Sequence, residues 1–443
     1  GQGIYLPACA MAAMPFKYWT GTMKFRFQFV CSGFHKGRVK VVYDPNFASS
    51  NEYNTNYIEI IDIAEKQDFT IELGNGQARS LLTSLTPGAD PISLAYGTTA
   101  LGINSKGNGV LSMYVVNELT TPDTTAPRDI EVNVFVSMGD DFEVFVPDKR
   151  FQRYAFRPQA GFEAQSGVEA AMTENDDSPP QQASSEVLGV GTTNHEDLNK
   201  VFVGETIKSF RPLLKRYALH SVLNGTLNAD RRSLYGRRTA FPFLRGGVAS
   251  AVHLDSFGNA LNYCNTLLLH WVTLAFSGYR GSIRWKVAPT CFIRPDNLPI
   301  INVERDISSR HYTNGRTAMF TPTNESQLAF QGALNSSLPL PETNKTLGGF
   351  NGMTLANGFV NPNIEFEVPY YSNDRFLPGK RESYTAGFGD TELNVWDYKI
   401  FVRADNESTF SAYAATGEDF QVYFWSGLPM VYYEPAPPSP SVA

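Results

Sequence analysis

The stretch Met23–Val30 reads MKFRFQFV, so apolar and polar side chains alternate along it with a period of two. Successive side chains of a β-strand point to opposite faces of a sheet, and this alternation therefore predicts a strand with one buried face. The pattern recurs in both halves of the chain and predicts further strands at 130–136, 142–146, 267–275, 395–402 and 420–425. We expect an all-β protein.

Composition favours the same fold class. The 443-residue chain has 13% aromatic residues together with 36 glycines and 27 prolines. Aromatic side chains suit a pleated, half-buried surface, and many turn-forming residues are typical of short strands joined by loops, which argues against a coiled coil or a helical bundle. The length predicts two or three domains, since roughly 100 to 200 residues form one.

Charge, hydropathy and cysteine spacing argue against several classes of protein. No apolar run reaches the roughly 20 residues that cross a bilayer, so we predict no membrane span. The net charge of −7 argues against a protein that coats nucleic acid with its whole surface. The sequence has no CxxC pair and no HExxH pattern, so we predict no metal site and no cofactor. Four cysteines are expected to be small buried apolar side chains in a reducing compartment: Cys9, Cys31, Cys264 and Cys291.

One segment differs in composition from the rest of the chain. Between Pro158 and Asn199 there are eight acidic residues and no Lys or Arg. Such a segment cannot bury enough apolar area to offset its ordering entropy, so we predict an acidic linker or arm at 158–200. The linker separates a first domain, 1–157, from a second domain, 201–435, which is followed by a Pro-rich tail at 436–443.

Two landmarks occur in the same order in both predicted domains. The first reads YWTGTMK at 18–24 and GYRGSIR at 278–284, and the second reads GDDFEV at 139–144 and GEDFQV at 417–422. Counted from glycine to glycine, the landmarks are 118 residues apart in the first domain and 136 in the second. We therefore predict a duplicated domain, each copy being a jelly-roll β-sandwich of about eight strands.

The two domains differ in length before the first landmark. About eighty residues of the second domain precede Gly281, whereas only twenty precede Gly21. The first domain therefore lacks room for its opening strand or strands, and we predict that it is truncated at its N-terminal side. Because the chain opens with Gly1 and not with an initiator Met, we interpret it as a piece of a longer polyprotein.

Four motifs carry a resemblance to a known family. They read PFKYWTG at 15–21, CSGFHKGR at 31–38, GETIKSFRPLLKRY at 204–217 and EVPYYS at 367–372. In this order they resemble motifs of the capsid polyproteins of picorna-like RNA viruses, of the cricket paralysis or dicistrovirus type and its relatives in marine algae. The resemblance covers the chain except for 158–200 and the tail.

The resemblance implies a structural role. It implies jelly-roll capsid subunits, released from a polyprotein, that assemble with other capsid subunits into a pseudo-T=3 icosahedral shell around single-stranded RNA. The protein would then lie in the virion capsid, and in the host-cell cytoplasm during assembly. It would not be an enzyme. A viral cysteine protease is an implied partner, and the host receptor is unknown.

The linker holds a candidate cleavage site. A protease of the implied kind cuts after Gln and before a small residue, which fits Gln165 and Ser166. Proteolysis concentrates on exposed segments without competing structure, as expected for this linker. The alternative is that Gln precedes Ser by chance in a polar stretch.

The motif Asp140-Asp141-Phe142 is the candidate for catalysis. In the viruses that the chain resembles, such a triplet is proposed to assist autolytic cleavage of a capsid precursor. Two adjacent carboxylates can provide one protonated and one ionised group, because like charges close together raise one pKa. The alternative is a turn in which Asp caps a loop and Phe enters the core. The recurrence of the motif at 417–420 favours the structural interpretation.

A basic tract lies between Thr206 and Ala240, with a net charge of +7. Such a tract suits salt-dependent contacts to phosphates, so we predict that it faces genomic RNA on the inner surface; the alternative is a solvated or subunit-contacting arm. Apolar residues at helical spacing and Pro212 predict a short helix near its start. Its basic residues are Lys208, Arg211, Lys215, Arg216, Arg231, Arg232, Arg237 and Arg238.

A second class of protein remains open. Jelly rolls also host lectin and glycosidase sites, so the chain could be a carbohydrate-binding or glycoside-hydrolysing β-sandwich. Such an enzyme needs two carboxylates about 5 to 10 Å apart across a cleft. The loops at 97–109 and 333–363 are our candidates for an exposed receptor-binding surface.

Overall fold

The structure, a computed structural model, describes residues 3–45, 57–77, 79–84, 108–121, 130–156, 186–188, 203–204, 207–225, 233–242, 244, 253–254, 260–261, 264–290, 300–306, 318–319, 351–358, 360–372, 374–379, 395–401 and 408–433. The chain forms two compact units. The first unit contains 6–151 and 163–208, and the second contains 1–5, 152–162 and 209–443. In the described part, no helix is long and apolar enough to span a membrane.

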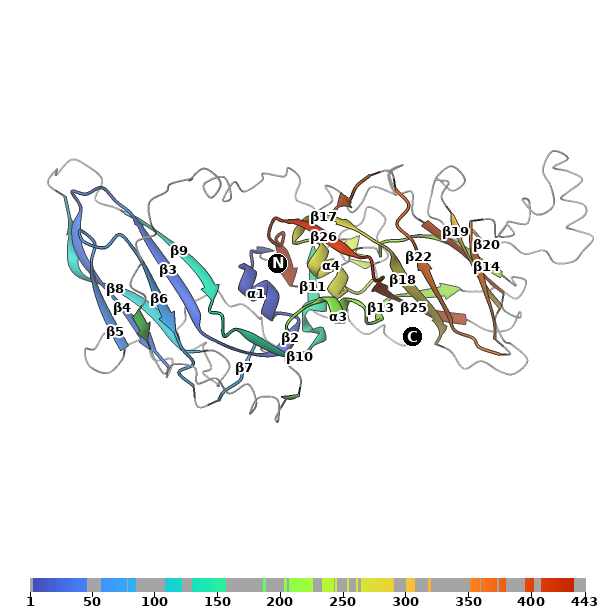
Figure 1. Ribbon diagram of the computed structural model, residues 1–443, viewed down its shortest axis with the longest axis horizontal. Coiled ribbons are helices and arrows are strands. Elements are labelled where there is room, and N and C mark those ends of the chain that lie inside the picture. Colours follow the sequence, from blue (N-terminus) through green and yellow to red (C-terminus); the bar gives the residue numbers. More distant parts are fainter. Residues whose placement is uncertain are drawn as a thin grey trace, which may run out of the picture. The chain divides into compact units, whose positions relative to one another are not determined.

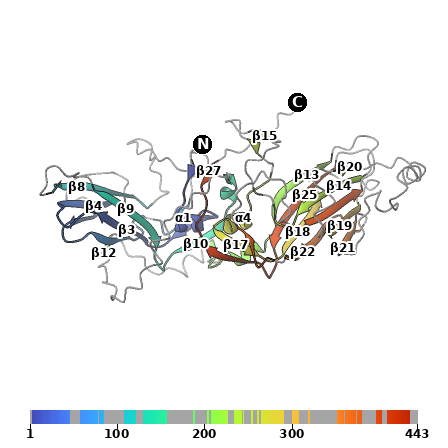
Figure 2. The ribbon, with the colours of Figure 1, turned by 90° about the horizontal axis from the view of Figure 1, so that it is seen from above.

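The second unit is built around two large sheets (Figures 1 and 2). One sheet consists, in spatial order, of β13 (Ala218–Gly225), β25 (Ser408–Thr416), β18 (Ile283–Pro289) and β22 (Ile364–Val368). The other consists of β20 (Ala318–Met319), β14 (Ser233–Thr239), β24 (Val395–Phe401), β19 (Ile300–Asp306) and β21 (Met353–Asn357). All these strand pairs are antiparallel, and the chain crosses repeatedly between the two sheets, as in an eight-stranded jelly roll.

The core of the second unit lies between these two sheets. From one sheet Ile283, Trp285 and Val287 of β18 point inward, and from the other Trp396 and Tyr398 of β24 meet them. All five are nearly inaccessible to solvent. The alternation of inward and outward residues along β18 is therefore the physical basis of the sandwich.

The first unit repeats part of this arrangement. One sheet has the order β12 (Glu186–Leu188), β6 (Asp68–Leu73), β3 (Met23–Val30) and β9 (Glu131–Met138). The other has the order β5 (Tyr57–Asp62), β4 (Lys36–Asp44) and β8 (Val110–Thr120). The strands β6, β3 and β9 correspond to β22, β18 and β25, and β5, β4 and β8 correspond to β21, β19 and β24.

No described strand of the first unit takes the place that β13 or β14 has in the second. The consequence is visible on β9, where Val132 and Val134 pair with β3 as Phe410 and Ala412 pair with β18. Val132 and Val134 are 36% and 50% exposed, whereas Phe410 and Ala412 are each 1% exposed. The predicted truncation of the first domain, like the predicted domain boundaries, stays a prediction.

Smaller sheets and short helices complete both units. The small sheets are β10 (Glu143–Pro147) with β2 (Phe16–Thr20) and β7 (Leu82–Thr83), β23 (Leu377–Pro378) with β17 (Phe276–Arg280) and β26 (Gln421–Trp425), and β15 (His253–Leu254) with β16 (Ala260–Leu261). A further sheet joins β1 (Gly3–Ile4), β27 (Val431–Tyr433) and β11 (Tyr154–Phe156). The helices among the described residues are α1 (Ala8–Ala13), α3 (Arg211–Leu214), α4 (Leu268–Thr273) and the 3₁₀ helix η1 (Lys149–Arg153).

The all-β prediction is confirmed, with one strand wrongly assigned. The predicted strand at 267–275 is the helix α4, which lies directly before β17. Every residue from Leu269 to Thr273 is buried, including the polar His270 and Thr273, so the helix has no solvent-exposed polar face there to mark its period. A short apolar run cannot be assigned to strand or helix by periodicity alone. Two cysteines also differ from expectation, because Cys9 and Cys31 are half-buried whereas Cys264 is buried.

Candidate functional site

The Asp-Asp-Phe motif of the first unit forms a turn that is held by one of its two carboxylates. The backbone N–H of Thr22 donates to Asp141 Oδ1 at 2.9 Å, and the Thr22 hydroxyl donates to Asp141 Oδ2 at 2.8 Å. The Gly139 N–H donates in turn to the Thr22 carbonyl at 2.7 Å. These hydrogen bonds therefore connect the turn before β10 with the turn between β2 and β3.

The second unit has the same arrangement of hydrogen bonds between its two turns. The backbone N–H of Ser282 donates to Asp419 Oδ1 at 2.9 Å, and the Gly417 N–H donates to the Ser282 carbonyl at 2.9 Å. The Ser282 hydroxyl contacts the carboxylates of both Asp419 and Glu367. A hydroxyl has one proton, so it donates to one of these carboxylates at a time.

A glycine makes this close approach possible in each unit. Gly21 has a φ of +130° and Gly281 a φ of +126°, a backbone conformation that L side chains rarely adopt. Seven residues after the glycine that opens each motif, Val146 and Phe424 have positive φ values of 59° and 56°. Such values are rare in bulky residues and store strain. Two strained positions in register support a shared structural role for the two motifs.

The arrangement assigns different surroundings to the two acids of the first motif. Both aspartates are exposed, but the Asp141 carboxylate also accepts hydrogen bonds from the backbone N–H and the hydroxyl of Thr22. Phe142 is half-buried, and its counterpart Phe420 packs in the core. The hydrogen bonds from Thr22 favour the structural interpretation for Asp141. A catalytic role of Asp140, Asp141 and Phe142 stays a prediction.

The hydrogen bonds to Asp419 predict an acid-sensitive turn. Burial raises the pKa of the Asp419 carboxyl, but the hydrogen bonds from Ser282 outweigh this effect, and the pKa lies below its ordinary value of 3.8. A carboxyl with a lowered pKa in the folded state stabilises the fold above its unfolded pKa and loses this contribution as the pH falls. We expect the urea midpoint of the second unit to fall below pH 3.8, and to fall less steeply in Asp419→Asn.

Asp374→Asn is the matched control for this pH series, because Asp374 is an exposed carboxylate of the same unit. It should retain the parent's pH dependence. Equal slopes below pH 3.8 for the parent and Asp419→Asn would contradict the assignment.

The basic residues of the tract have different surroundings in the structure. Lys208, Arg211 and Arg216 are exposed in or next to α3, in which Pro212 occupies the first turn as predicted. Lys215 forms an ion pair with Glu418, so its charge is balanced within the unit. Arg237 and Arg238 lie in β14, opposite Asp397 and Trp396.

Several predicted site residues lie outside the described part. These are the cleavage residues and two members of the basic tract: Gln165, Ser166, Arg231 and Arg232. Of the receptor-loop candidates, the structure describes 108–109, 351–358 and 360–363, where Val360 is 89% exposed and Leu355 59% exposed.

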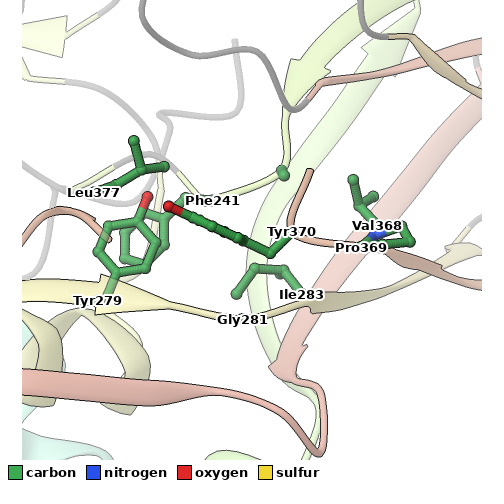
Figure 3. Close-up of a pocket in the computed structure, with 9 residues that line it drawn as sticks. Phe241, Tyr279, Gly281, Ile283, Val368, Pro369, Tyr370 and Leu377 are labelled. Carbon is green, nitrogen blue, oxygen red and sulfur yellow. The ribbon is translucent and has the colours of Figure 1, made fainter. Parts of the chain in front are cut away.

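A pocket of the second unit offers a test of the carbohydrate alternative (Figure 3). The Tyr279 and Tyr370 side chains point their hydroxyl ends toward each other beside Leu377, with Phe241 and Ile283 also on its wall. The cavity has a volume of about 20 Å³, which holds roughly one water molecule. Its lining contains no carboxylate among the described residues, so it lacks the pair of acids that glycoside hydrolysis needs.

Sequence reasoning missed the hydroxyl partners of the two motifs. Thr22 and Ser282 follow directly after the glycines of the first landmark, so the signal was present as a small hydroxyl residue after Gly21 and Gly281. Within the described residues, no group of three or more His, Cys, Asp or Glu side chains is arranged to hold a metal ion.

The sheets and the repeated turn define a protein of two related β-sandwich units, the second with the arrangement of a jelly roll. The chain belongs to the family described as CRPV capsid protein like, whose model matches residues 196–436, more than half of the chain. The resemblance drawn from the four sequence motifs is thereby confirmed.

Individual relatives agree with this family. The chain is similar to the structural polyprotein of cricket paralysis virus, with 21% identity over 94% of this chain and 49% of the relative. It is also similar to the genome polyprotein of deformed wing virus, with 28% identity over 32% of this chain and 5% of the relative. The chain thus spans half or less of the length of these curated relatives.

Among solved structures, the chain is similar to that of a marine algae virus of the order Picornavirales. The identity is 22%, the TM-score 0.47, and the match covers 59% of this chain and 99% of the other. For Triatoma virus the identity is 21%, the TM-score 0.33 and the coverage 53% and 75%.

Proposed function

We propose that this chain is a structural part of the pseudo-T=3 icosahedral shell of a non-enveloped positive-strand RNA virus, released from a polyprotein. One observation carries the proposal. The two-sheet sandwich of the second unit lies within 196–436, the range matched by the capsid family. The protein acts in the virion and assembles in the host cytoplasm with other capsid subunits.

Expression of the precursor region that contains this chain tests the proposal by electron microscopy. We expect closed shells of uniform diameter, because capsid subunits associate through their edges and loops once processed. Free monomers under all conditions of salt and pH, together with binding of an oligosaccharide, would favour the carbohydrate alternative instead.

Processing of the precursor is proposed to occur at the bond between Gln165 and Ser166. The composition of the acidic linker supports it, since exposed segments without regular structure are the preferred sites of proteolysis. Mass spectrometry of purified particles should identify a subunit that begins at Ser166. An intact chain across this bond in mature particles would exclude the site.

Separate substitution of the two aspartates distinguishes a structural from a catalytic role of the Asp-Asp-Phe motif. Asp141→Asn removes an ionised acceptor from Thr22 and should lower the free energy of unfolding by about 1 to 3 kcal/mol. Asp140→Asn should leave stability within about 0.5 kcal/mol, because Asp140 is exposed. Denaturant titration measures both values.

Precursor cleavage then decides the catalytic hypothesis. If the motif acts only as a turn, Asp140→Asn particles mature at the rate of the parent. If it assists autolysis, Asp140→Asn or Asp141→Asn leaves the precursor uncut in particles that assemble normally. Unchanged cleavage in both variants would remove the catalytic role.

Inner-surface RNA binding is proposed for the exposed residues of the basic tract. Each Lys or Arg that contacts a phosphate of single-stranded RNA adds about 0.7 to the slope of log K against log salt. The triple variant Lys208→Gln, Arg211→Gln, Arg216→Gln should therefore weaken RNA binding about tenfold or more and reduce this slope by about 2. Filter binding to a single-stranded RNA measures both.

Lys286→Gln serves as a single-site control for RNA binding. Lys286 lies 2.6 Å from Glu365 and its charge is already balanced, so its loss should leave the salt slope unchanged. Equal RNA affinity for the triple variant and the parent would contradict the proposal and favour the arm interpretation.

A further inference from the structure

The small sheet of β23, β17 and β26 in the second unit has one inner and one outer face. Tyr279, Leu377 and Val422 point inward, where they belong to or pack against the core. Because successive side chains of a strand point to opposite faces, Phe376 and Tyr423 lie on the outer face. Their rings stack at 5.6 Å between centroids. The outer face therefore begins a cluster of aromatic side chains.

Three rings of this cluster are exposed to solvent. The exposed fraction is 38% for Phe376, 69% for Phe424 and 50% for Trp425. Phe376 meets Phe424 edge-on at 6.0 Å between centroids. Trp425 meets Phe276 edge-on at 5.3 Å. We call these side chains the aromatic patch: Phe276, Phe376, Tyr423, Phe424 and Trp425. Contiguous exposed apolar side chains often mark an interaction site.

The fold of the turn does not require the exposed rings at 424 and 425. The first unit has the same positive φ at the corresponding place, where it carries Val146 and Pro147 instead. In a regular strand Phe424 and Trp425 would point to opposite faces. The φ of 56° at Phe424 interrupts this alternation, and both rings are exposed. The aromatic side chains are thus specific to the second unit, although the backbone geometry is shared.

Gly278 of β17 leaves room for the patch. It pairs with Tyr423, and the corresponding pair of the first unit is Tyr18 with Phe145. A Cβ at Gly278 would overlap the ring of Phe376. The position of this ring therefore depends on a glycine that the first unit does not have at the same place.

The charges around the patch favour a protein partner over RNA. The exposed Asp374 and Arg375 precede Phe376 and have opposite charges, and the exposed Gln421 at the start of β26 is neutral. Arg280 lies over the ring of Tyr370, at 5.4 Å from its centroid. Stacking on single-stranded RNA is combined with a positively charged groove, which these described residues do not form. A border of mixed charge does not repel a copy of itself, and a two-fold contact requires such self-complementarity.

The size of the patch determines how strong such a contact is. Its three exposed rings offer about 300 Å² per copy, since a Phe or Trp side chain buries about 150 to 250 Å². A stable interface buries about 800 Å² per partner. We therefore expect a weak association, with a Kd of about 10 to 100 μM. Weak contacts of this kind become effective when many of them form in one assembly.

We propose that the aromatic patch binds the same patch on a second copy of this chain about a two-fold axis, with Phe424 at the centre. Aromatic side chains are enriched at the centres of protein interfaces, where they carry most of the binding energy. The contact goes beyond the proposed function, because it is a property of the chain alone and needs neither cleavage of the linker nor RNA.

Sedimentation equilibrium of the full chain tests the contact. We expect a reversible monomer–dimer equilibrium in the parent. Phe424→Gly should raise the Kd at least about tenfold, because it removes the central ring. The same variant should be as stable as the parent in denaturant titration, since glycine adopts a positive φ without strain. A parent that stays monomeric up to about 1 mM, or a Phe424→Gly variant that dimerises like the parent, would overturn the proposal.

Matched variants separate the patch from other exposed apolar residues. Val146→Gly makes the same change at the corresponding positive φ of the first unit, and Leu355→Ser removes a 59% exposed side chain of β21. Both should keep the Kd within about threefold of the parent. If either weakens the dimer as much as Phe424→Gly, the contact is not specific to the patch and the proposal is rejected. If Phe424→Gly is less stable than the parent, Phe424→Asn replaces it, because Asn also tolerates a positive φ.

Filter binding to a single-stranded RNA tests the other class of partner. The parent and Phe424→Gly should bind this RNA with equal affinity. A monomeric parent whose RNA affinity falls in Phe424→Gly would mean that the patch stacks on bases, and would overturn the contact between copies.

The outcome is distinguishable from failure of the proposed function. A precursor that forms no closed shells would reject the capsid role and leave the dimer of the isolated chain as measured. A parent chain that stays monomeric would reject the contact and leave the capsid role intact.

Discussion

Replacement of Gly281 by alanine is expected to lower the free energy of unfolding of the second unit by about 3 to 5 kcal/mol. A Cβ at this position would lie 2.4 Å from Phe420 Cα and 2.8 Å from the Asp419 carbonyl oxygen. Both atoms belong to the backbone, which cannot move aside as a flexible side chain does. The φ of +126° adds strain for any L residue. The variant should therefore break the hydrogen bonds between Ser282 and Asp419.

Gly427 provides the matched control for this glycine. It also has a positive φ, +75°, but no atom lies within 4 Å of the added Cβ, so Gly427→Ala should cost only about 1 kcal/mol. Denaturant titration followed by circular dichroism compares the two variants. Similar losses for Gly281→Ala and Gly427→Ala would mean that the dihedral angle alone matters, and that the close approach to Phe420 does not.

The same steric effect is expected at Gly21 in the first unit. A Cβ on Gly21 would lie 2.7 Å from Phe142 Cα, so Gly21→Ala should destabilise the first unit by a similar mechanism. The tight crossing of the two turns is thus the shared structural feature of the duplicated landmarks. It gives the glycine before the strand and the Asp-Phe pair a structural role, because they serve the packing of one turn on the other.

The features that the sequence predicted correctly are those with a local signal. The alternation in Met23–Val30 identified β3 with the bounds that the structure has. The recurrence of GDDFEV as GEDFQV identified the duplication, because the turn requires the same residue types in both units. In each case the physical constraint acts on neighbouring residues, and the pattern can be read from them.

The features that were missed depend on partners far apart in the chain. Strands β1, β11 and β12 have two or three residues each, too few to show a period. Their pairing with β27 and β6 is decided by burial of Tyr154 and by a free sheet edge, which exist only after folding. The helix α4 was missed for a related reason, since the burial of 269–273 removes the solvent-exposed polar face that marks a helix.

The aromatic core of the second unit predicts the other large effect. Trp285 is 2% exposed, its indole N–H donates to the Ala240 carbonyl at 2.9 Å, and its ring packs at 5.3 Å from that of Trp396. Trp285→Ala should cost about 4 kcal/mol, the transfer term of a large ring plus the cavity left behind. Trp425→Ala is the control, because Trp425 is 50% exposed and should cost about 1 kcal/mol.

The double variant shows whether the two rings act as one packing unit. Trp285→Ala already removes the surface against which Trp396 packs, so adding Trp396→Ala should cost about 1 to 2 kcal/mol less than it does alone. Trp396 comes from β24 and Trp285 from β18, so this coupling measures the contact between the two sheets directly. If the losses in free energy of unfolding of the two single variants simply add in the double variant, the two rings do not stabilise each other. Contacts other than this pair would then stabilise the sandwich.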